Sequence, residues 1–300
     1  MKHGKPRKTY DDAMAEFVNE HLQSLKPSAR RRYHTSIDRL TPRLGGMFLD
    51  DINTTRLREF VAYRRREGVK DATIRRDLAC LSSMFTLAVS EGWADANPVK
   101  NMDKRSIRES APRTRYLSHN EETALIYHSG AYLWPMVTFA IDTGLRLEEQ
   151  LSLEWSQVDL RRGEIFIPNT KTDMPRTVQL LSRSARFLAQ SPVYLRSPYV
   201  FVKKGGARYG KLTRGLAGAC RRAGIKDLKW HDLRRTCGCR LLQDHGLDIF
   251  KVRDWLGHKS VAVTERSYSF LGDETIREAL RVGTIMGTGA ADSSSREGAK

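Results

Sequence analysis

The chain has 300 residues, 40% of them hydrophobic, and carries 52 Lys and Arg against 35 Asp and Glu, a net charge of +17. This length allows one large or two ordinary domains with a buried core. The charge favours a polyanionic partner through counterion release, although charge alone leaves a basic protein without such a partner open. The basic N-terminus and the lack of long apolar runs indicate neither secretion nor membrane insertion. Four cysteines without paired CxxC spacing indicate reduced thiols, so we expect a cytoplasmic protein.

Residues 8–96 are predicted to form a four-helix domain, because apolar residues recur at helical spacing in each segment. The predicted helices run from Asp11 or Asp12, one of which would cap the first helix, to about Leu25, from Ala29 to about Leu40, onward from Asn53 and Thr54, and from Asp71 to about Glu91. Arginines fall outside the apolar faces. In isolation, such a cluster is as often a solvated surface as a phosphate contact. The arginines concerned are Arg30, Arg31, Arg32, Arg64, Arg65, Arg66, Arg75 and Arg76.

The rest of the chain divides at a segment of irregular composition. Residues 97–115 hold two prolines and several charges without periodicity, which predicts a flexible linker. Residues 116–273 would form the second domain, in which Ser118 is a candidate cap of the first helix. Residues 274–300 begin with an apolar spacing that fits a short helix and end in a small, polar tail that we expect to be disordered.

A tight turn and a hairpin follow in the second domain. An apolar helix after Pro135 is expected to lead into a turn at Gly144 that presents Arg146 at a helix start. Glu149, three residues later, is either a carboxylate that orients an arginine or histidine, or a plain surface glutamate. The hairpin is predicted from Val158 to Pro168 and from Arg176 to Leu180, because both segments alternate and are β-branched. A basic, mostly helical stretch over 183–225 contains a Gly-rich loop. The hairpin-tip lysine is Lys171, and two lysines of the loop are Lys203 and Lys204.

Residues 230–268 gather side chains suited to phosphodiester chemistry. A helix beginning at His231 places Arg234 on the same face, because residues three apart are neighbours on a helix. His258 follows a second helix that ends in glycine, and Tyr268 comes ten residues later. A phenol with an ordinary pKa of about 10 becomes a nucleophile only beside cations and a proton acceptor. Arginine offers a fork of donors to phosphate oxygens, and histidine carries protons near neutrality.

Together these motifs resemble the tyrosine recombinase (phage integrase) family. TGLRLEEQLSLEW, with Arg146 and Glu149, is similar to the first family box; HDLRRT, LGHKS and the downstream tyrosine are similar to the second; GEIFIPNTKTDMPRTVQL resembles the hairpin that carries the family's lysine. The resemblance covers Leu117 to about Leu271, and the preceding segment fits the family's DNA-clamping domain. It therefore favours contact of the arginines listed above, and of Lys203 and Lys204, with the DNA backbone. It implies a mainly α fold with a small antiparallel β-sheet, built from an N-terminal four-helix core-binding (SAM-like) domain and a C-terminal tyrosine-recombinase catalytic domain.

The resemblance also implies a reaction, which is site-specific cleavage and rejoining of DNA through a 3′-phosphotyrosine, for integration or excision of a mobile element. It implies no ATP, metal or cofactor. The implied partners are double-stranded DNA, a tetramer of this chain on two DNA sites, and accessory DNA-bending proteins at the nucleoid. The implied catalytic residues are Arg146, Lys171, His231, Arg234, His258 and Tyr268.

Two departures from the family pattern and two other functions stay open. Tyr268 stands ten residues after His258, where the commonest spacing is nine, and one extra residue rotates a helical side chain by about 100°. Arg235 stands where many members have histidine. A type IB topoisomerase shares the catalytic set but acts as a monomer, and a DNA-binding recombination factor with a dead site lacks the reaction. The apolar segment after Tyr268 favours a recombinase over a topoisomerase.

Overall fold

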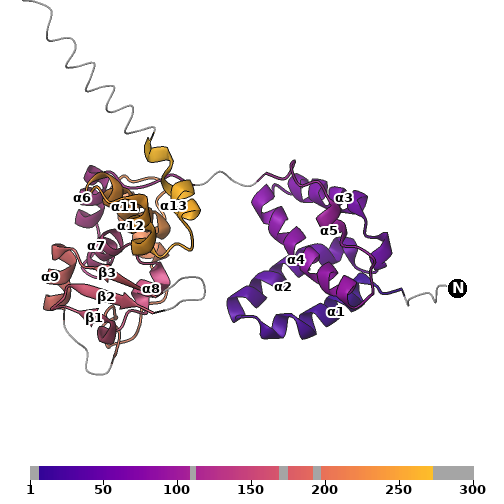
Figure 1. Cartoon of the computed structure of the whole chain (residues 1–300), viewed down its shortest axis with the longest axis horizontal. Helices are drawn as coiled ribbons and strands as arrows, with labels where there is room; N and C mark the ends of the chain where they lie inside the picture. The colour runs from indigo at the N-terminus through magenta and orange to yellow at the C-terminus, as the bar shows by residue number, and fades with distance from the viewer. Residues whose placement is uncertain (1–6, 109–112, 169–174, 192–196, 273–300) are drawn as a thin grey trace, which may run out of the picture. The chain divides into compact units, whose positions relative to one another are not determined.

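The computed structural model of the chain describes residues 7–108, 113–168, 175–191 and 197–272 (Figure 1). The chain divides into two compact units, unit 1 from Met1 to Ala111 and unit 2 from Pro112 to Lys300. Each unit has a hydrophobic core of its own. Within the described ranges, no helix combines the length and the apolar character needed to cross a membrane.

Unit 1 is helical because amphipathic segments share one apolar core, which confirms the four predicted helices. Its elements are α1 (Tyr10–Glu20), η1 (Leu22–Ser24), α2 (Pro27–Leu44), η2 (Leu49–Asp51), α3 (Thr54–Arg66), α4 (Asp71–Ser90) and the short α5 (Pro98–Asn101). Phe17, Leu57 and Phe85 are fully buried where α1, α3 and α4 meet. Thr9 caps α1, since its hydroxyl accepts a hydrogen bond of 3.2 Å from the Asp12 amide. The predicted aspartate cap is therefore wrong.

The segment predicted to be a flexible linker is packed onto unit 1 over much of its length. Asn97 caps α5, and its side-chain amide donates to the Ser82 carbonyl oxygen at 2.9 Å. Val99, Met102 and Ile107 are buried in the unit 1 core. The structure thus differs from the predicted linker between residues 97 and 107, because three apolar side chains suffice to anchor a segment without helical periodicity.

Arg64 does not point outward as predicted. Its side chain is 8% exposed and forms ion pairs with Glu67 at 2.6 Å and Asp77 at 3.3 Å. Asp77 also accepts a hydrogen bond of 2.9 Å from the Ser36 hydroxyl, and burial raises the pKa of this carboxyl despite its partners. Arg64 follows the buried Phe60 by four residues and so lies on the apolar face of α3. Arg64 is held by carboxylates of its own unit, so the prediction that it falls outside the apolar face of its helix is wrong.

Unit 2 packs helices around a three-stranded antiparallel sheet of order β1-β2-β3 (Figure 1). Its elements are α6 (His119–Tyr127), α7 (Trp134–Thr143), α8 (Leu147–Leu151), η3 (Trp155–Gln157), β1 (Val158–Asp159), β2 (Glu164–Ile167), β3 (Arg176–Gln179), α9 (Ser182–Gln190), α10 (Thr213–Arg222), α11 (Trp230–Gln243), α12 (Ile249–Leu256) and α13 (Val261–Tyr268). The segment predicted as one strand, Val158 to Pro168, forms the two strands β1 and β2. A turn through Gly163, which has φ +66°, folds β2 back onto β1. Pairing of Ile165 with Val178 confirms the hairpin of β2 and β3.

Helices α7 and α11 pack against each other within unit 2. Helix α7 is buried throughout except at its first residue, and α11 buries Leu233, Cys237 and Leu241. Ser118 caps α6 through a capping box with Glu121, as predicted. This packing brings the turn after α7 beside the first two turns of α11, which are the segments that carry the predicted site residues.

Candidate active site

The turn between α7 and α8 presents Arg146. Gly144 has a left-handed backbone with φ +65°, and a Cβ there would lie 2.6 Å from Leu256 Cδ2 and 3.0 Å from Cys237 Sγ. Only glycine fits both the conformation and the space. Arg146 is consequently the N-cap residue of α8, with its side chain 33% exposed. The prediction that Gly144 places Arg146 at a helix start is confirmed.

Glu149 is buried and orients two arginines. Its carboxylate accepts from Arg146 Nη1 at 3.1 Å, from the Arg146 backbone amide at 2.9 Å and from Arg176 Nη2 at 2.7 Å. Burial opposes ionisation of Glu149, but Arg176 and Arg146 outweigh it and hold the pKa of the carboxyl below its ordinary value. Of the two interpretations of Glu149, the structure supports the orienting carboxylate.

Arg176 lies in the site although the predicted catalytic set does not include it; the sequence marks it only as the other cation close to the hairpin tip. Its side chain is 6% exposed, and its Nε donates to the Trp255 carbonyl oxygen at 3.1 Å. A Cβ at Gly257 would lie 2.9 Å from the Arg176 side chain, so the end of α12 rests directly on it. The available signal is its inward place on β3, two residues before the buried Val178. The alternation of a strand predicts that Arg176 faces inward, but it does not predict whether the guanidinium is buried or reaches solvent at the edge of the core.

Arg234 is almost fully buried in the second turn of α11. Its Nη1 donates to the Gly144 carbonyl oxygen at 2.7 Å and its Nη2 to the Leu256 carbonyl oxygen at 2.5 Å. Burial, followed by the charges of Arg146 and Arg176, lowers the pKa of Arg234 to about 10, which leaves it charged at neutral pH. The side chain therefore ties the turn after α7 to the end of α12 and places a second cation near Arg146.

His231 begins the first turn of α11, three residues before Arg234. His231 is exposed, whereas Arg234 is buried. Partial desolvation and the charges of Arg234, Arg235 and Arg146 lower its pKa, while Asp232 acts in the opposite direction. The imidazole is therefore neutral at pH 7 and able to accept a proton.

His258 is fixed to the helix that carries the tyrosine. Its Nδ1 lies 2.9 Å from the hydroxyl of Thr264, a fully buried residue of α13. Burial and then Arg234 and Arg146 lower the pKa of His258 to about 3. Thr264 is a second positioning residue that the sequence did not single out, and its hydrogen bond sets the orientation of the ring.

Tyr268 ends α13 with its ring in the unit 2 core, where the residue is 5% exposed. A Cβ at Gly238 would lie 2.1 Å from the Tyr268 hydroxyl, so this hydroxyl rests against α11 one turn beyond Arg234. Burial raises the pKa of the phenol, and Arg234 opposes that rise. The phenol of α13 is thus buried against α11, the helix that carries His231 and Arg234, and it is protonated there.

The basic side chains expected to contact DNA differ in how they are held. Lys171 lies outside the described residues. Arg65 forks onto Asp71 with two hydrogen bonds of 2.9 Å, and Arg75 donates to the Ile107 carbonyl oxygen at 2.7 Å. Both are therefore partly engaged within unit 1. Besides Arg65, the exposed members are Arg31, Arg32, Arg66, Arg76, Lys203 and Lys204, and Arg30 is half-buried.

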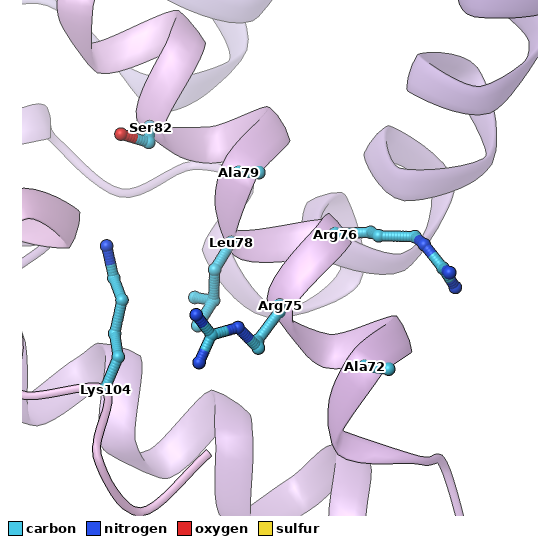
Figure 2. A pocket seen from close by; sticks show the side chains of 7 residues that line it. All are labelled: Ala72, Arg75, Arg76, Leu78, Ala79, Ser82 and Lys104. Atoms are coloured by element: carbon cyan, nitrogen blue, oxygen red, sulfur yellow. The ribbon is translucent and has the colours of Figure 1, made fainter. Parts of the chain in front are cut away.

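A hollow of about 670 Å³ lies along α4 between some of these cations (Figure 2). Arg75, Arg76 and Lys104 line it together with Ser82. Figure 2 shows Arg75 and Arg76 leaving α4 in different directions, while Lys104 reaches in from the segment after α5. Three cations and a hydroxyl around one hollow suit contacts to a sugar-phosphate backbone.

The site as a whole offers guanidinium donors, two imidazoles and a phenol from four separate segments. Guanidinium forks bind phosphate oxygens and stabilise the charge that builds on them during displacement. The imidazoles are suited to proton transfer, and the phenol is a potential nucleophile. In the part of the chain that the structure describes, no group of three His, Cys, Asp or Glu side chains is placed to hold a metal ion.

Comparisons with known proteins agree with this arrangement. Residues 115–273 match the phage integrase family, and residues 10–107 match the phage integrase SAM-like domain. The shufflon-specific DNA recombinase of Escherichia coli is 30% identical over 208 residues, which cover 68% of this chain and 52% of that protein. The chain thus spans about half the length of this relative.

Solved structures share the fold. A lambda integrase dimer bound to a COC′ core site superposes with a TM-score of 0.74 at 18% identity, covering 87% of this chain and 77% of that one. A lambda integrase tetramer bound to a Holliday junction gives 0.73 at 19% identity, covering 87% and 78%. The mainly α fold with a SAM-like and a catalytic domain is confirmed, and the chain belongs to the phage integrase family of tyrosine-type site-specific recombinases.

Proposed function

We propose that the chain cleaves and rejoins DNA strands at specific sites, with the Tyr268 hydroxyl as the nucleophile. The phenolic oxygen bonds to phosphorus as the bond to the 5′ oxygen breaks, which leaves a 3′-phosphotyrosine and a free 5′-hydroxyl. A 5′-hydroxyl of a partner strand then reverses the step on the same phosphorus. No ATP is consumed, because the phosphotyrosine conserves the bond energy.

Each side chain of the site has a role in this proposal. Arg146 and Arg234 hold the two non-bridging oxygens, and one well-placed donor of this kind is worth about 2.7–4 kcal/mol of barrier. His231 accepts the phenolic proton, and His258 donates a hydrogen bond to a phosphate oxygen. Lys171, at the hairpin tip, protonates the departing 5′ oxygen.

A surplus of buried positive charge is the observation that carries the proposal. Among the described residues, the Arg234 guanidinium meets two backbone carbonyl oxygens and has no carboxylate at ion-pair distance. Burial, and after it the charges of Arg234 and Arg146, lower the pKa of His258 to about 3. Buried cations without a matching anion are costly, and a phosphodiester supplies that anion.

The same proposal assigns the partners. The hollow on α4 and the exposed arginines of α2 and α3 would contact the DNA backbone and position the chain without reading bases. Lambda integrase binds a core site as a dimer and a Holliday junction as a tetramer. By analogy, we expect four copies of this chain on two sites, with accessory DNA-bending proteins, in the integration or excision of a mobile element at the nucleoid.

Covalent trapping tests the proposal. Nicked duplexes with a randomised sequence beside the nick would be incubated with the full chain, and denaturant-resistant protein–DNA adducts would be sequenced. We expect adducts at one sequence class. Tyr268→Phe should abolish adducts while retaining DNA binding, and Tyr127→Phe, which removes a phenol that is 82% exposed on α6, should leave them unchanged.

Each other outcome selects a different function. DNA binding without any adduct would indicate a recombination factor with a dead site. Adducts without strand exchange between two duplexes, together with relaxation of supercoils by the monomer, would indicate a type IB topoisomerase. Adducts that persist in Tyr268→Phe would remove Tyr268 from its role.

A further inference from the structure

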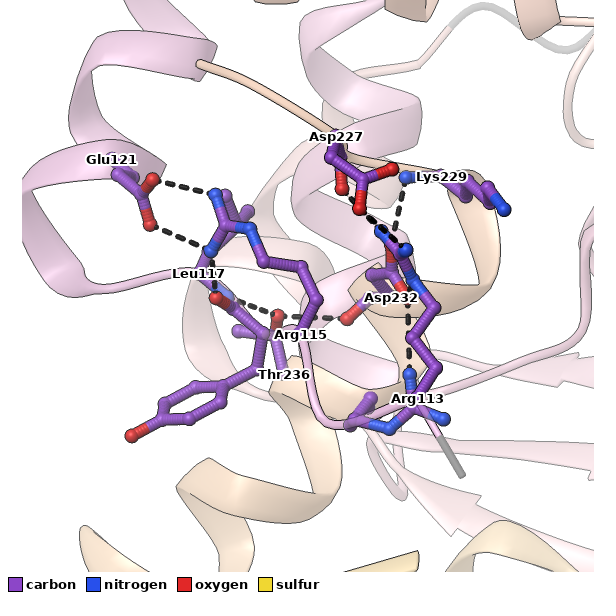
Figure 3. A network of polar contacts seen from close by, with 10 residues as sticks. Arg113, Arg115, Leu117, Glu121, Asp227, Lys229, Asp232 and Thr236 are labelled. Atoms are coloured by element: carbon purple, nitrogen blue, oxygen red, sulfur yellow. Dashed lines mark hydrogen bonds and ion pairs between the residues drawn. The ribbon is translucent and has the colours of Figure 1, made fainter. Parts of the chain in front are cut away.

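A forked ion pair fastens the beginning of unit 2 to the helix of the active site (Figure 3). Arg113 Nε donates to the two carboxylate oxygens of Asp232 at 2.8 and 3.0 Å, and its Nη2 donates to Oδ2 at 2.7 Å. Its Nη1 donates to Asp227 Oδ2 at 2.8 Å, and Nη2 also reaches the Asp227 carbonyl oxygen. One guanidinium thus spans the first turn of α11 and the loop before it.

Asp232 is the neighbour of His231 in the chain and is 0% exposed. Besides Arg113, it accepts from Arg235 Nη1 at 3.0 Å and from the Lys229 backbone amide at 2.8 Å. The bond to Lys229 caps α11. Each oxygen of the buried carboxylate therefore accepts from Arg113 and from a second donor in α11 or at its N-cap. The first turn of α11 is thus held by a residue 119 positions away.

Asp227 shows that the loop before α11 is held in an unfavourable conformation. Its φ is +48°, and among the described residues it is the sole non-glycine with a left-handed backbone. Such a residue persists only where its surroundings fix it. Arg113 supplies two of those contacts, and its charge holds the pKa of the Asp227 carboxyl below its ordinary value.

Arg115 provides a contrast two residues further along. It points to the other side of the same segment (Figure 3) and forks onto the Glu121 oxygens at 2.5 and 2.9 Å. Glu121 belongs to the capping box of α6. Both arginines therefore anchor the segment through carboxylates at a helix start, but only the pair with Arg113 involves the helix of His231.

We propose that Arg113 is a positioning residue for the strand-cleavage step, because through Asp232 and Asp227 it sets the first turn of α11 and thereby the place of His231 beside Arg234. This inference rests on the proposed function, in which His231 accepts the phenolic proton. Since Arg113 is the first described residue of unit 2, the chain entering that unit is fastened to α11 before it reaches α6.

The proposal has an electrostatic consequence with a definite sign. The charged and titratable groups that face His231 are Arg146, Arg234, Arg235, Asp232 and His258. Asp232 favours the imidazolium, whereas the arginines disfavour it. Removal of Arg113 takes away one of the cations that balance Asp232, so the pKa of His231 should rise. The neutral, proton-accepting form of His231 would then be lost at a higher pH.

The test compares Arg113→Gln and Arg113→Lys with the matched control Arg115→Gln in the full chain. The first readout is NMR titration of His231 without DNA, which does not depend on activity. The second is the rate of adduct formation on the trapped nicked duplex between pH 5.5 and 8.5. For Arg113→Gln we expect the acid limb to move up by about half a pH unit, with a roughly threefold loss of rate on that limb, and a lower rate at high pH because the fork is lost as well.

Arg113→Lys keeps the positive charge but loses the forked hydrogen bonds. We therefore expect the acid limb of its pH–rate profile to match the wild type and its rate at high pH to be lower. It also provides a result should Arg113→Gln fail to fold. An unmoved His231 titration in Arg113→Gln, a wild-type rate at high pH in Arg113→Lys, or the same shift in Arg115→Gln would overturn the proposal and leave Arg113 with a structural role only. Absence of adducts from the wild-type chain would contradict the proposed function, while the titration would still decide the link between Arg113 and His231.

Discussion

Arg64 in unit 1 and Arg234 in unit 2 are both buried, but of these two only Arg64 meets carboxylates. Arg64 lies between α3 and α4 with Glu67 at 2.6 Å and Asp77 at 3.3 Å. In unit 2, Arg234 is just as buried, yet its fork ends on the carbonyl oxygens of Gly144 and Leu256. The two arginines therefore have similar burial and opposite charge balance.

This difference separates a structural arginine from a functional one. A buried cation that meets carboxylates within its own unit needs nothing from outside. A buried cation that meets backbone dipoles, beside Arg146 and Arg176, keeps a positive potential that an external anion can relieve. Burial, and after it this positive potential, lower the pKa values of His231 and His258. Buried charge indicates function only when the surrounding partners leave it unbalanced.

The largest expected effect comes from removing Arg64, the buried arginine that meets carboxylates. Arg64→Met should destabilise unit 1 by about 3–5 kcal/mol, because it leaves the Asp77 carboxylate buried without its partner. Hydrogen exchange of α2 and α4 peptides in the full chain measures this loss. The control Arg65→Met removes a surface pair with Asp71, so the exchange of these peptides should stay near that of the wild type. The double variant Arg64→Met with Asp77→Leu should recover most of the stability, and failure to recover it would argue against the ion pair as the cause.

The next largest effect is expected at Arg146, which lies beside Arg176 and Arg234 in unit 2. Arg146→Gln should slow adduct formation by about 100- to 1,000-fold with little loss of stability, because its side chain is partly exposed and its role lies in the transition state. Arg208→Gln is the matched control, since Arg208 pairs with Glu148 of the same helix at 2.7 Å. Single-turnover trapping measures both rates. A loss below about tenfold for Arg146→Gln would place the phosphate elsewhere.

The smallest expected effect is the change of folding stability with pH that His258 causes. The folded-state pKa of His258 is lowered to about 3, whereas an unfolded histidine titrates near 6.5. The unfolded chain therefore binds more protons below pH 6.5, so stability is full above that pH and falls as the pH drops toward 3. Between pH 6.5 and 5 this residue should account for up to about 1.5 kcal/mol. Urea unfolding of the wild type and of His258→Asn checks it; equal pH slopes would contradict the cause.

Local spacing was sufficient wherever one segment decides the outcome. The helix of His231 and Arg234, the stop at Gly257 and the presentation of Arg146 by Gly144 depend on residues within a few positions of one another. Backbone propensity and helix periodicity act over that range. The same reasoning failed for Arg64, because a triplet of arginines does not say which member falls on the apolar face.

The order of the motifs, the helices of unit 1 and the family resemblance were thus contained in the sequence. Only the tertiary structure decided which charges are paired: Arg64 with Asp77, Arg176 with Glu149, and Arg113 with Asp232. It also decided that Gly238 seats the Tyr268 hydroxyl. These contacts join residues 13, 27 and 119 positions apart, in the order of the pairs given. Hydrophobic periodicity determines which faces become buried, but the partner of a buried charge is set by how separate segments pack, and the periodicity of one segment carries no information about that packing.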